Sequence, residues 1–163
     1  MGILDGVIMA KWTIGKGIDS YIKQLGDLEF GAEEMAKEAV YEGAKIVTDA
    51  VRASIEALPV GPPREGKVTA IQKQGLLDGL GIAGFRKDGS FINVKVGMDG
   101  YNGERSRKYP RGQPNALIAR SLESGSSVAP KQPFIGPAVS RTRRAAEKAI
   151  EKKLDEEIKK TMS

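Results

Sequence analysis

Apolar residues recur at helical spacing across residues 29–58, and Pro59 follows directly after them. The spacing predicts a long amphipathic helix that ends before the proline, because proline disfavours helical geometry in the residue that precedes it. The apolar positions are Met35, Ala39, Val40, Ile46, Val47, Ala50, Val51, Ile55 and Leu58. The small residues Ala36, Gly43 and Ala44 form a strip on which another helix or a sheet is expected to pack closely.

A second long helix is predicted over residues 137–161, where a thin apolar stripe runs through densely charged sequence. The stripe consists of Ala138, Ala146, Ile150, Leu154 and Ile158. Pro137 suits a first helical turn, in which its missing N–H has no partner to lose. A short amphipathic helix is expected over residues 17–25, inside an N-terminal segment 1–28, whereas residues 116–123 fit either a strand or a short helix.

Alternating apolar and polar residues predict an antiparallel hairpin within residues 76–98. Its strands are expected at 80–86 and 90–98, with a turn at 87–89, because Asp-Gly between alternating segments is a strong turn signal. Ile92, Val94, Val96 and Met98 share the face expected to be buried. Residues 60–75 are predicted to form a loop.

A weak edge strand is expected near Trp12 and Ile14. Residues 1–163 therefore predict a single α+β domain, in which a long N-terminal helix and a C-terminal helix pack on a small antiparallel β-sheet with long loops. The glycine-rich stretch 79–84 lacks the surroundings of a phosphate-binding loop, so turn and bulge glycines explain it better.

The composition excludes most enzyme classes. The chain has no cysteine and no histidine, so disulfides, thiolate nucleophiles, the usual zinc ligands and triads built on histidine are ruled out. No spacing of carboxylates, lysines or serines indicates a catalytic site, and no cofactor is expected. No apolar run is long enough to span a bilayer, and the first residues lack the pattern of a signal peptide.

The net charge of +5 is distributed unevenly. Residues 1–60 carry −4, residues 61–137 carry +6 and residues 138–163 carry +3. Subunits with an acidic end and a basic end can associate head to tail. The same distribution also fits charges that simply solvate different faces of one molecule.

The strongest candidate binding segment is a basic loop, expected over residues 99–115. Its cations are Arg105, Arg107, Lys108 and Arg111, interleaved with Tyr101 and Tyr109 and opposed by Glu104. Such a loop suits contact with nucleic acid, because cations neutralise phosphates and aromatic rings stack on bases. The alternative is a solvated loop that becomes ordered against a neighbouring subunit.

Arg141, Arg143 and Arg144 form a second cluster, near the start of the predicted C-terminal helix. Positive charge near a helix N-terminus opposes the helix dipole and costs about 0.3–1 kcal/mol when exposed. We therefore expect a carboxylate to offset it, with the acidic first helix of a neighbouring copy as the hypothesis.

The most specific motif precedes that helix. Residues 119–125 read Ala-Arg-Ser-Leu-Glu-Ser-Gly, and residues 130–137 read Pro-Lys-Gln-Pro-Phe-Ile-Gly-Pro. The prolines predict a stiff path. Taken alone, Phe134 fits the core of a packed connector, because large apolar residues are usually buried. Taken together, the order resembles the end of the phage minor tail component family, also called tail completion or head–tail joining proteins.

That family typically reads Leu-Glu-Phe-Gly-Thr, then Pro-Ala-Arg-Pro-Phe-Leu-Arg-Pro-Ala. This chain departs from it by Ser124 in place of the aromatic residue and by Lys131 and Gln132 in place of Ala-Arg. The resemblance runs from about residue 17 to the end, is densest over residues 116–150, and favours the short helix at residues 116–123.

The resemblance implies a non-enzymatic structural protein of the virion neck or tail, present in the host cytoplasm during assembly. It implies a ring of copies, with six as the expected number, that contacts the head–tail connector and tail proteins around a channel for DNA, with no membrane partner. The interface candidates are Lys131, Gln132, Phe134, Arg141, Arg143 and Arg144. A tail terminator ring and a small nucleic-acid-binding protein that uses the basic loop are the alternatives.

Overall fold

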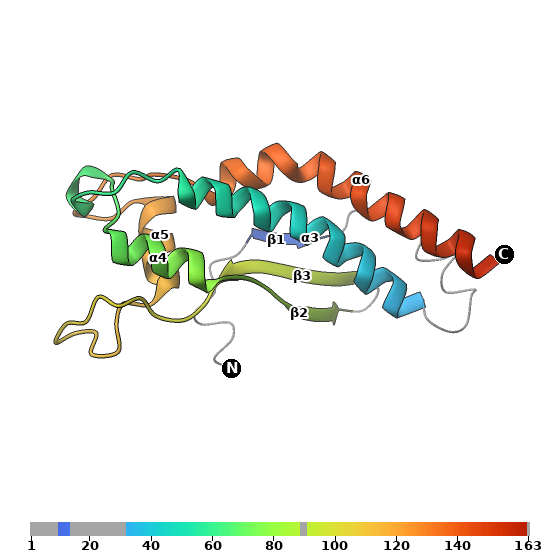
Figure 1. Cartoon of the computed structure of the whole chain (residues 1–163), viewed down its shortest axis with the longest axis horizontal. Helices are drawn as coiled ribbons and strands as arrows, with labels where there is room; N and C mark the ends of the chain where they lie inside the picture. Colours follow the sequence, from blue (N-terminus) through green and yellow to red (C-terminus); the bar gives the residue numbers. More distant parts are fainter. Residues whose placement is uncertain (1–9, 14–31, 89–90, 163) are drawn as a thin grey trace.

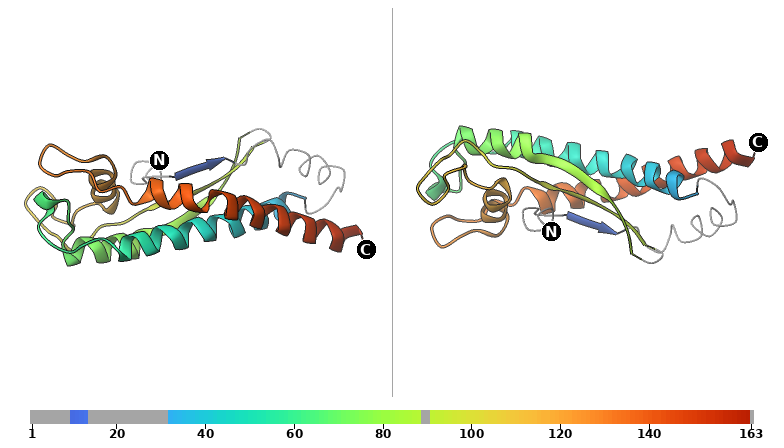
Figure 2. Two further views of the ribbon diagram at one scale, coloured as in Figure 1. Left: turned by 90° about the horizontal axis from the view of Figure 1, so that it is seen from above. Right: turned by 90° about the horizontal axis from the view of Figure 1, so that it is seen from below.

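In the computed structural model, which describes residues 10–13, 32–88 and 91–162, two long helices lie side by side over a small sheet. Helix α3 spans Ala32–Glu56 and helix α6 spans Ile135–Met162. They run in opposite directions along the length of the molecule (Figures 1 and 2). The two long helices predicted from the apolar stripes are thus confirmed.

The contact between α3 and α6 forms much of the core. Ala36, Gly43 and Ala44, the predicted small strip, are all buried, which allows close approach of the neighbouring elements. From α6, the stripe residues Ala138, Ala146, Ile150 and Leu154 are buried and Ile158 packs against the core. The predicted burial of one side of α6 is therefore confirmed.

The sheet has three antiparallel strands in the order β1-β3-β2, with β1 at Ala10–Thr13, β2 at Leu80–Asp88 and β3 at Phe91–Met98. Strands β2 and β3 form the predicted hairpin. Strand β2 continues through Asp88, further than expected, and Gly89 of the predicted turn lies outside the described residues. The pairing shifts register between Ala83 and Arg86, as a bulge glycine in this stretch predicts.

One face of the sheet is covered by the helices. Val94, Val96 and Met98 of β3 are buried on that face, as the alternation predicts, and the side chain of Ile92, predicted on the same face, lies outside the described part of the structure. Helix α3 packs over β2 and β3, and α6 reaches β1 (Figures 1 and 2). The expected edge strand near Trp12 is β1, whereas Ile14 lies outside the described residues. The α+β architecture is thus confirmed.

The prediction of a loop over residues 60–75 is wrong in its second half. A short 3₁₀ helix, Pro63–Glu65, is followed by helix α4 at Ala70–Gly79, which also takes the first residues assigned to the hairpin. Helix α4 has no continuous apolar stripe and contains Gly75, so periodicity does not reveal it. Its start is marked by a capping box between Thr69 and Gln72, whose side chains each accept a hydrogen bond from the other's backbone N–H at 3.1 Å.

Helix α5 spans Asn115–Ser124, so the helical alternative for residues 116–123 is confirmed. The short helix expected over residues 17–25 lies outside the described residues. Three loops, residues 57–69, 99–114 and 125–134, gather with α4 and α5 at the end of the molecule opposite the C-terminus (Figure 1). We call this region the loop end.

Candidate functional site

The motif that carries the family resemblance folds into one joint between α5 and α6. The Glu123 carboxylate, near the end of α5, accepts hydrogen bonds from the first backbone N–H groups of α6. Its Oε2 accepts from Phe134 and Ile135, both at 2.9 Å, and its Oε1 accepts from Gly136 at 2.7 Å. A carboxylate at this place satisfies N–H groups that have no partner within the helix, and it also complements the helix dipole.

This cap explains why α6 begins at Ile135, two residues before the predicted start. Pro137 still lies in the first turn, where a missing N–H is tolerated. In the sequence, the residue that determines this start is Glu123, and the stiff loop after it brings the first residues of α6 back to the Glu123 carboxylate. Periodicity cannot reveal such a contact, because the carboxylate and the N–H groups lie on different elements.

The joint is closed by burial and by a backbone hydrogen bond. Leu122, Phe134 and Ile135 are buried, and the N–H of Gln132 donates to the carbonyl of Leu122 at 2.6 Å. The prediction of Phe134 as an interface residue is wrong, because only 3% of its surface is exposed and its side chain belongs to the chain's own core. The core alternative, weighed from burial statistics, holds instead.

Lys131 and Gln132 are exposed on the loop before α6, as interface candidates must be. A tight turn in the same loop presents Val128, which is 71% exposed. In this turn the Ser126 N–H donates to the Ala129 carbonyl at 3.0 Å.

Arg141, Arg143 and Arg144 are exposed on α6. Two of them, Arg141 and Arg143, contact side chains of the same chain. Arg141 donates to the Ser54 hydroxyl of α3 at 3.4 Å, and Arg143 pairs with Glu147 one turn later at 3.4 Å. Because α6 starts at Ile135, the cluster lies beyond the first turn, where the dipole effect fades. The negative charge that the cluster was expected to need at the N-terminus is supplied by Glu123. A carboxylate from a neighbouring copy stays a prediction.

The basic loop occupies residues 99–114 and ends in a narrow hairpin. The N–H of Ser106 donates to the carbonyl of Tyr109 at 3.0 Å, and the N–H of Tyr109 donates back to the carbonyl of Ser106 at 3.1 Å. Arg107 and Lys108 therefore form the tip, and the Lys108 ammonium lies 5.4 Å from the centre of the Tyr109 ring. All four predicted cations of the loop, Arg105, Arg107, Lys108 and Arg111, are exposed.

A buried asparagine holds the base of this loop. Asn102 is 5% exposed, and its Oδ1 accepts from the backbone N–H groups of Glu104 at 2.9 Å and Gln113 at 3.1 Å. Its Nδ2 donates to the Gln113 side-chain oxygen at 3.3 Å, which also accepts from Gln72 of α4 at 3.0 Å. Gly112, at φ 104°, closes the loop where any side chain would collide with the Asn102 carbonyl. The loop is therefore tied to α4 in one conformation.

Asn115, at the start of α5, forms a second anchor and is 2% exposed. Its Nδ2 donates to the Asp99 carbonyl at 2.8 Å, and its backbone N–H donates to the Gly100 carbonyl at 3.0 Å. Two glycines of α4 leave room for this contact, since a Cβ on Gly79 would lie 2.2 Å from the Asp99 carbonyl and one on Gly75 would lie 2.5 Å from the Asn115 amide oxygen. Local sequence patterns missed Asn102, Asn115 and Gln72, because their partners lie on other elements.

The carboxylate inside the basic loop is directed away from the cations. Glu104 accepts a hydrogen bond from the Thr69 hydroxyl at 3.1 Å, at the start of α4. Among the described residues, no ion pair involves any of the four loop cations. The positive charge of the loop is thus left to the solvent.

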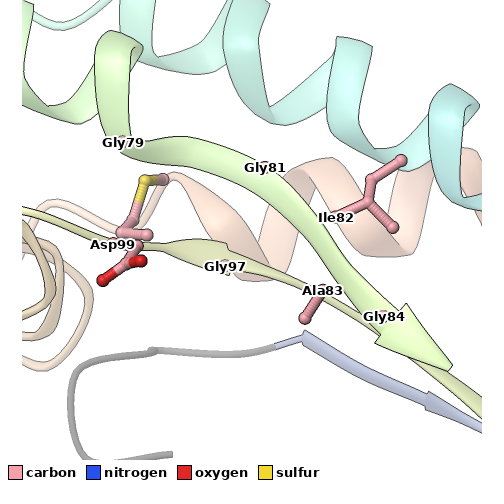
Figure 3. A pocket seen from close by; sticks show the side chains of 8 residues that line it. Gly79, Gly81, Ile82, Ala83, Gly84, Gly97 and Asp99 are labelled. Carbon is pink, nitrogen blue, oxygen red and sulfur yellow. The ribbon is translucent and has the colours of Figure 1, made fainter. Parts of the chain in front are cut away.

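A cavity of about 290 Å³ lies along β2 and the end of β3, next to the end of α4 (Figure 3). Its lining is mostly backbone and small apolar side chains, including Gly81, Ala83 and Gly97, with Asp99 at one edge. The Asp99 carboxylate accepts from the Gly100 N–H at 2.7 Å. The lining residues include no nucleophile or base arranged for catalysis.

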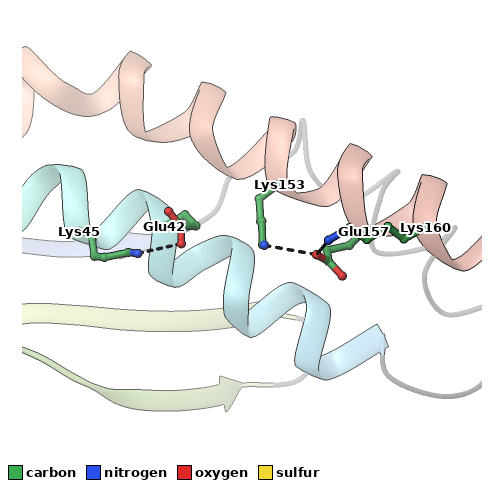
Figure 4. Close-up of polar contacts among 5 residues, drawn as sticks. All are labelled: Glu42, Lys45, Lys153, Glu157 and Lys160. Carbon is green, nitrogen blue, oxygen red and sulfur yellow. Dashed lines mark hydrogen bonds and ion pairs between the residues drawn. The ribbon is translucent and has the colours of Figure 1, made fainter.

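At the other end of the molecule, ion pairs lie along the seam between α3 and α6 (Figure 4). Lys153 donates to Glu157, with their charged atoms 3.3 Å apart, and Lys160 lies 3.4 Å from the same carboxylate. The hydrogen bond from Lys153 lowers the pKa of the Glu157 carboxyl, and Lys160 acts in the same direction. The same bond raises the pKa of Lys153, and Glu38 and Glu42 of α3 add to that shift.

No family model, curated protein or solved structure matches this chain. Within the described ranges, no group of three or more acidic side chains is placed to hold a metal ion. None of the described helices has both the length and the apolar character needed to cross a membrane.

Proposed function

We propose that this chain is a structural protein of the neck or tail of a tailed phage, which forms a ring that completes the tail and joins it to the head. The proposal assigns it no enzymatic activity. Its sites are then contact surfaces toward other copies of the chain and toward the adjacent connector and tail proteins.

One observation carries the proposal: the two halves of the motif that resembles the tail completion family form a single structural unit. Glu123 comes from the Leu-Glu half. The backbone N–H groups that donate hydrogen bonds to its carboxylate belong to the Pro-Phe-Ile half and to the glycine after it. Leu122 and Phe134 are both buried around this contact. The resemblance therefore rests on residues that act together to fix the start of α6, which makes a chance match of separate fragments a poorer explanation.

Exposed apolar side chains give further support. Most large apolar residues that are exposed in the described part of the chain lie at the loop end, where a contact surface would use them. They are Val60, Ile71, Tyr101, Leu117 and Val128, whereas Tyr41 lies on α3. A surface that combines such residues with exposed cations suits repeated docking between subunits.

The test is assembly of the purified full chain, alone and with the connector and tail-tube proteins encoded beside it. Native mass spectrometry and electron microscopy are expected to show closed rings, either alone or on those partners. The variant Val128→Asp should weaken ring formation, and the matched control Ser127→Asp, on the neighbouring exposed position, should have a smaller effect. A chain that stays monomeric beside all of these partners, or that turns over a substrate, contradicts the proposal.

A further inference from the structure

We propose that the basic loop, residues 99–114, binds the phosphate backbone of DNA without sequence preference, through Arg105, Arg107, Lys108 and Arg111. This binding function goes beyond the ring-forming role proposed above and does not depend on it. A monomer would have the same site.

Uncompensated charge is the first argument. The loop contains four exposed cations and two carboxylates, Asp99 and Glu104. Glu104 accepts from Thr69 and Asp99 accepts from the backbone of Gly100, and in the described part of the chain neither forms an ion pair with the cations, so the loop keeps a net charge of +2. Arg64 and Lys131, on the other two loops of the loop end, are exposed as well. Clustered cations of this kind attract phosphates and release counterions when they bind.

Preorganisation is the second argument. The reciprocal backbone hydrogen bonds between Ser106 and Tyr109 fix the turn that carries Arg107 and Lys108. The buried amide of Asn102 fixes the base of the loop, and Gly112 fixes its return. The backbone is therefore already ordered before a ligand arrives, which lowers the entropy cost of binding.

The absence of sequence preference follows from the shape of the site. The described part of the loop contains no helix or strand long enough to enter a groove, so its cations are suited to phosphates rather than to base edges. Tyr101 is 58% exposed and pairs with Pro114 at the base of the loop, and its ring is available to stack on an unpaired base. Single-stranded and double-stranded DNA share the phosphate chemistry, so they are compared in the test.

An acidic face of a second copy, such as α3, is the competing partner. Glu34 pairs with Lys37 at 3.2 Å, and Glu42 pairs with Lys45 at 2.8 Å. These pairs account for two of the six carboxylates of α3, and the helix still carries a net charge of −3. DNA presents closely spaced phosphates to all four loop cations at once, and binding to a second copy is an outcome that the test distinguishes.

The test measures the affinity of the full chain for a short labelled duplex of random sequence and for a labelled oligothymidine, by fluorescence anisotropy over a range of salt concentrations. If all four cations contact phosphates of the duplex, log K falls with log salt with a slope of about −3.6. This slope corresponds to a loss on the order of 100-fold in affinity between about 50 and 200 mM salt. Tighter binding of the oligothymidine would support the proposal and assign the exposed Tyr101 a stacking role.

The loop variant replaces Arg105, Arg107, Lys108 and Arg111 with Gln. The control replaces Arg144, Lys148, Lys152 and Lys159, four exposed cations of α6, with Gln and so changes the net charge by the same amount. The loop variant is expected to lose at least about tenfold in affinity and most of the salt slope, while the control keeps both nearly intact. A third variant with lysine at Arg105, Arg107 and Arg111 keeps the charge and should retain the slope.

Equal losses in the loop variant and the control overturn the proposal, because general net charge would then account for binding. No measurable binding of either DNA at low salt also overturns it. If the wild type binds neither DNA but the loop variant alone loses self-association, the loop is a protein contact and the proposal is wrong. Circular dichroism of each variant ensures that folded proteins are compared, since every substituted side chain is exposed.

Discussion

In the body of the molecule, formed by α3, α6 and the sheet, the buried side chains are almost all apolar, whereas the loop end is built around buried amides. Ile55, Ile150 and Leu154 are among the largest fully buried side chains of the body. At the loop end, Gln72, Asn102 and Asn115 are buried together with the glycines that admit them. The body is held mainly by the removal of apolar surface from water. The loop end also buries apolar side chains such as Val68, Leu76 and Leu122, and adds hydrogen bonds of fixed direction.

The comparison separates two properties: the body contributes most of the stability, whereas the loop end has the more strictly specified backbone conformation. Apolar burial is not directional, so a core of similar volume can be filled in several ways. Buried amide groups are costly when they lack partners, so the hydrogen bonds that they do make favour one loop conformation. Among the described side chains, the buried Oδ1 of Asn115 is the one such atom without a hydrogen-bond partner. The regions that we propose for contact and DNA binding lie at the end where geometry is specified most tightly.

The largest expected effect is on the body. Ile55→Ala removes a side chain that is 0% exposed, and it should lower the free energy of unfolding by about 2–5 kcal/mol, through lost burial and the cavity left behind. Tyr41→Ala, an exposed position on the same helix, should change it much less. Chemical denaturation followed by circular dichroism measures both. Equal effects of the two substitutions would mean that α3 does not pack as described.

At the loop end, Asn102→Ala should cost about 1–3 kcal/mol, because it leaves the partly buried N–H groups of Glu104 and Gln113 without their acceptor. The loss should be local. Hydrogen exchange measured by mass spectrometry is expected to speed up within the basic loop and to change little in α3 and α6. Gln74→Ala, at an exposed position of α4, serves as the control. Uniform acceleration over the whole chain would contradict the separation of the two regions.

At the joint between the two regions, Glu123→Gln keeps the size of the cap and removes its charge. The expected loss is about 0.5–2 kcal/mol, typical of a helix N-terminal cap. Hydrogen exchange should accelerate in the first turn of α6. Glu151→Gln, at an exposed position later in α6, should leave both quantities nearly unchanged, and a matching loss there would assign the effect to net charge.

The smallest expected effect concerns pH and the seam between α3 and α6. Because the folded state lowers the pKa of Glu157, its contribution to stability is present above its ordinary pKa of about 4.3 and is lost as pH falls through the lowered value. Glu157→Gln should therefore flatten part of the acid side of a plot of unfolding free energy against pH. Lys153, whose pKa is raised, contributes below its ordinary pKa of about 10.4 and loses that contribution above its folded-state value.

Glu156→Gln, on the exposed neighbour of Glu157, is the control for this measurement. Identical acid profiles for the two variants would show that the seam does not distinguish Glu157 from other surface carboxylates.

The body could be predicted from the sequence because its signals are periodic and local. The stripe from Met35 to Leu58 and the alternation of Val94, Val96 and Met98 each report one buried face. The start of α6 was misplaced by two residues, because a carboxylate on another element decides it.

The loop end could be predicted only in part. The cations of the basic loop are visible in the sequence, and they are exposed as expected. The side chains that hold the loop in place are not visible, since Gln72, Asn102 and Asn115 belong to three different segments and only the fold brings them together. Helix α4 was not predicted for a related reason. The glycines that leave room for these amide side chains also weaken its helical sequence pattern.

The antiparallel pairing of α3 with α6 has a consequence for synthesis in the cell. About 100 residues separate the end of the earlier helix from the end of the later one, so ribosomes working at 5–20 residues per second need roughly 5–20 s to deliver its partner. During this interval the part of the apolar face of α3 that α6 covers in the folded protein stays exposed. Overproduction at low temperature, or with a holdase chaperone, should accordingly raise the soluble yield.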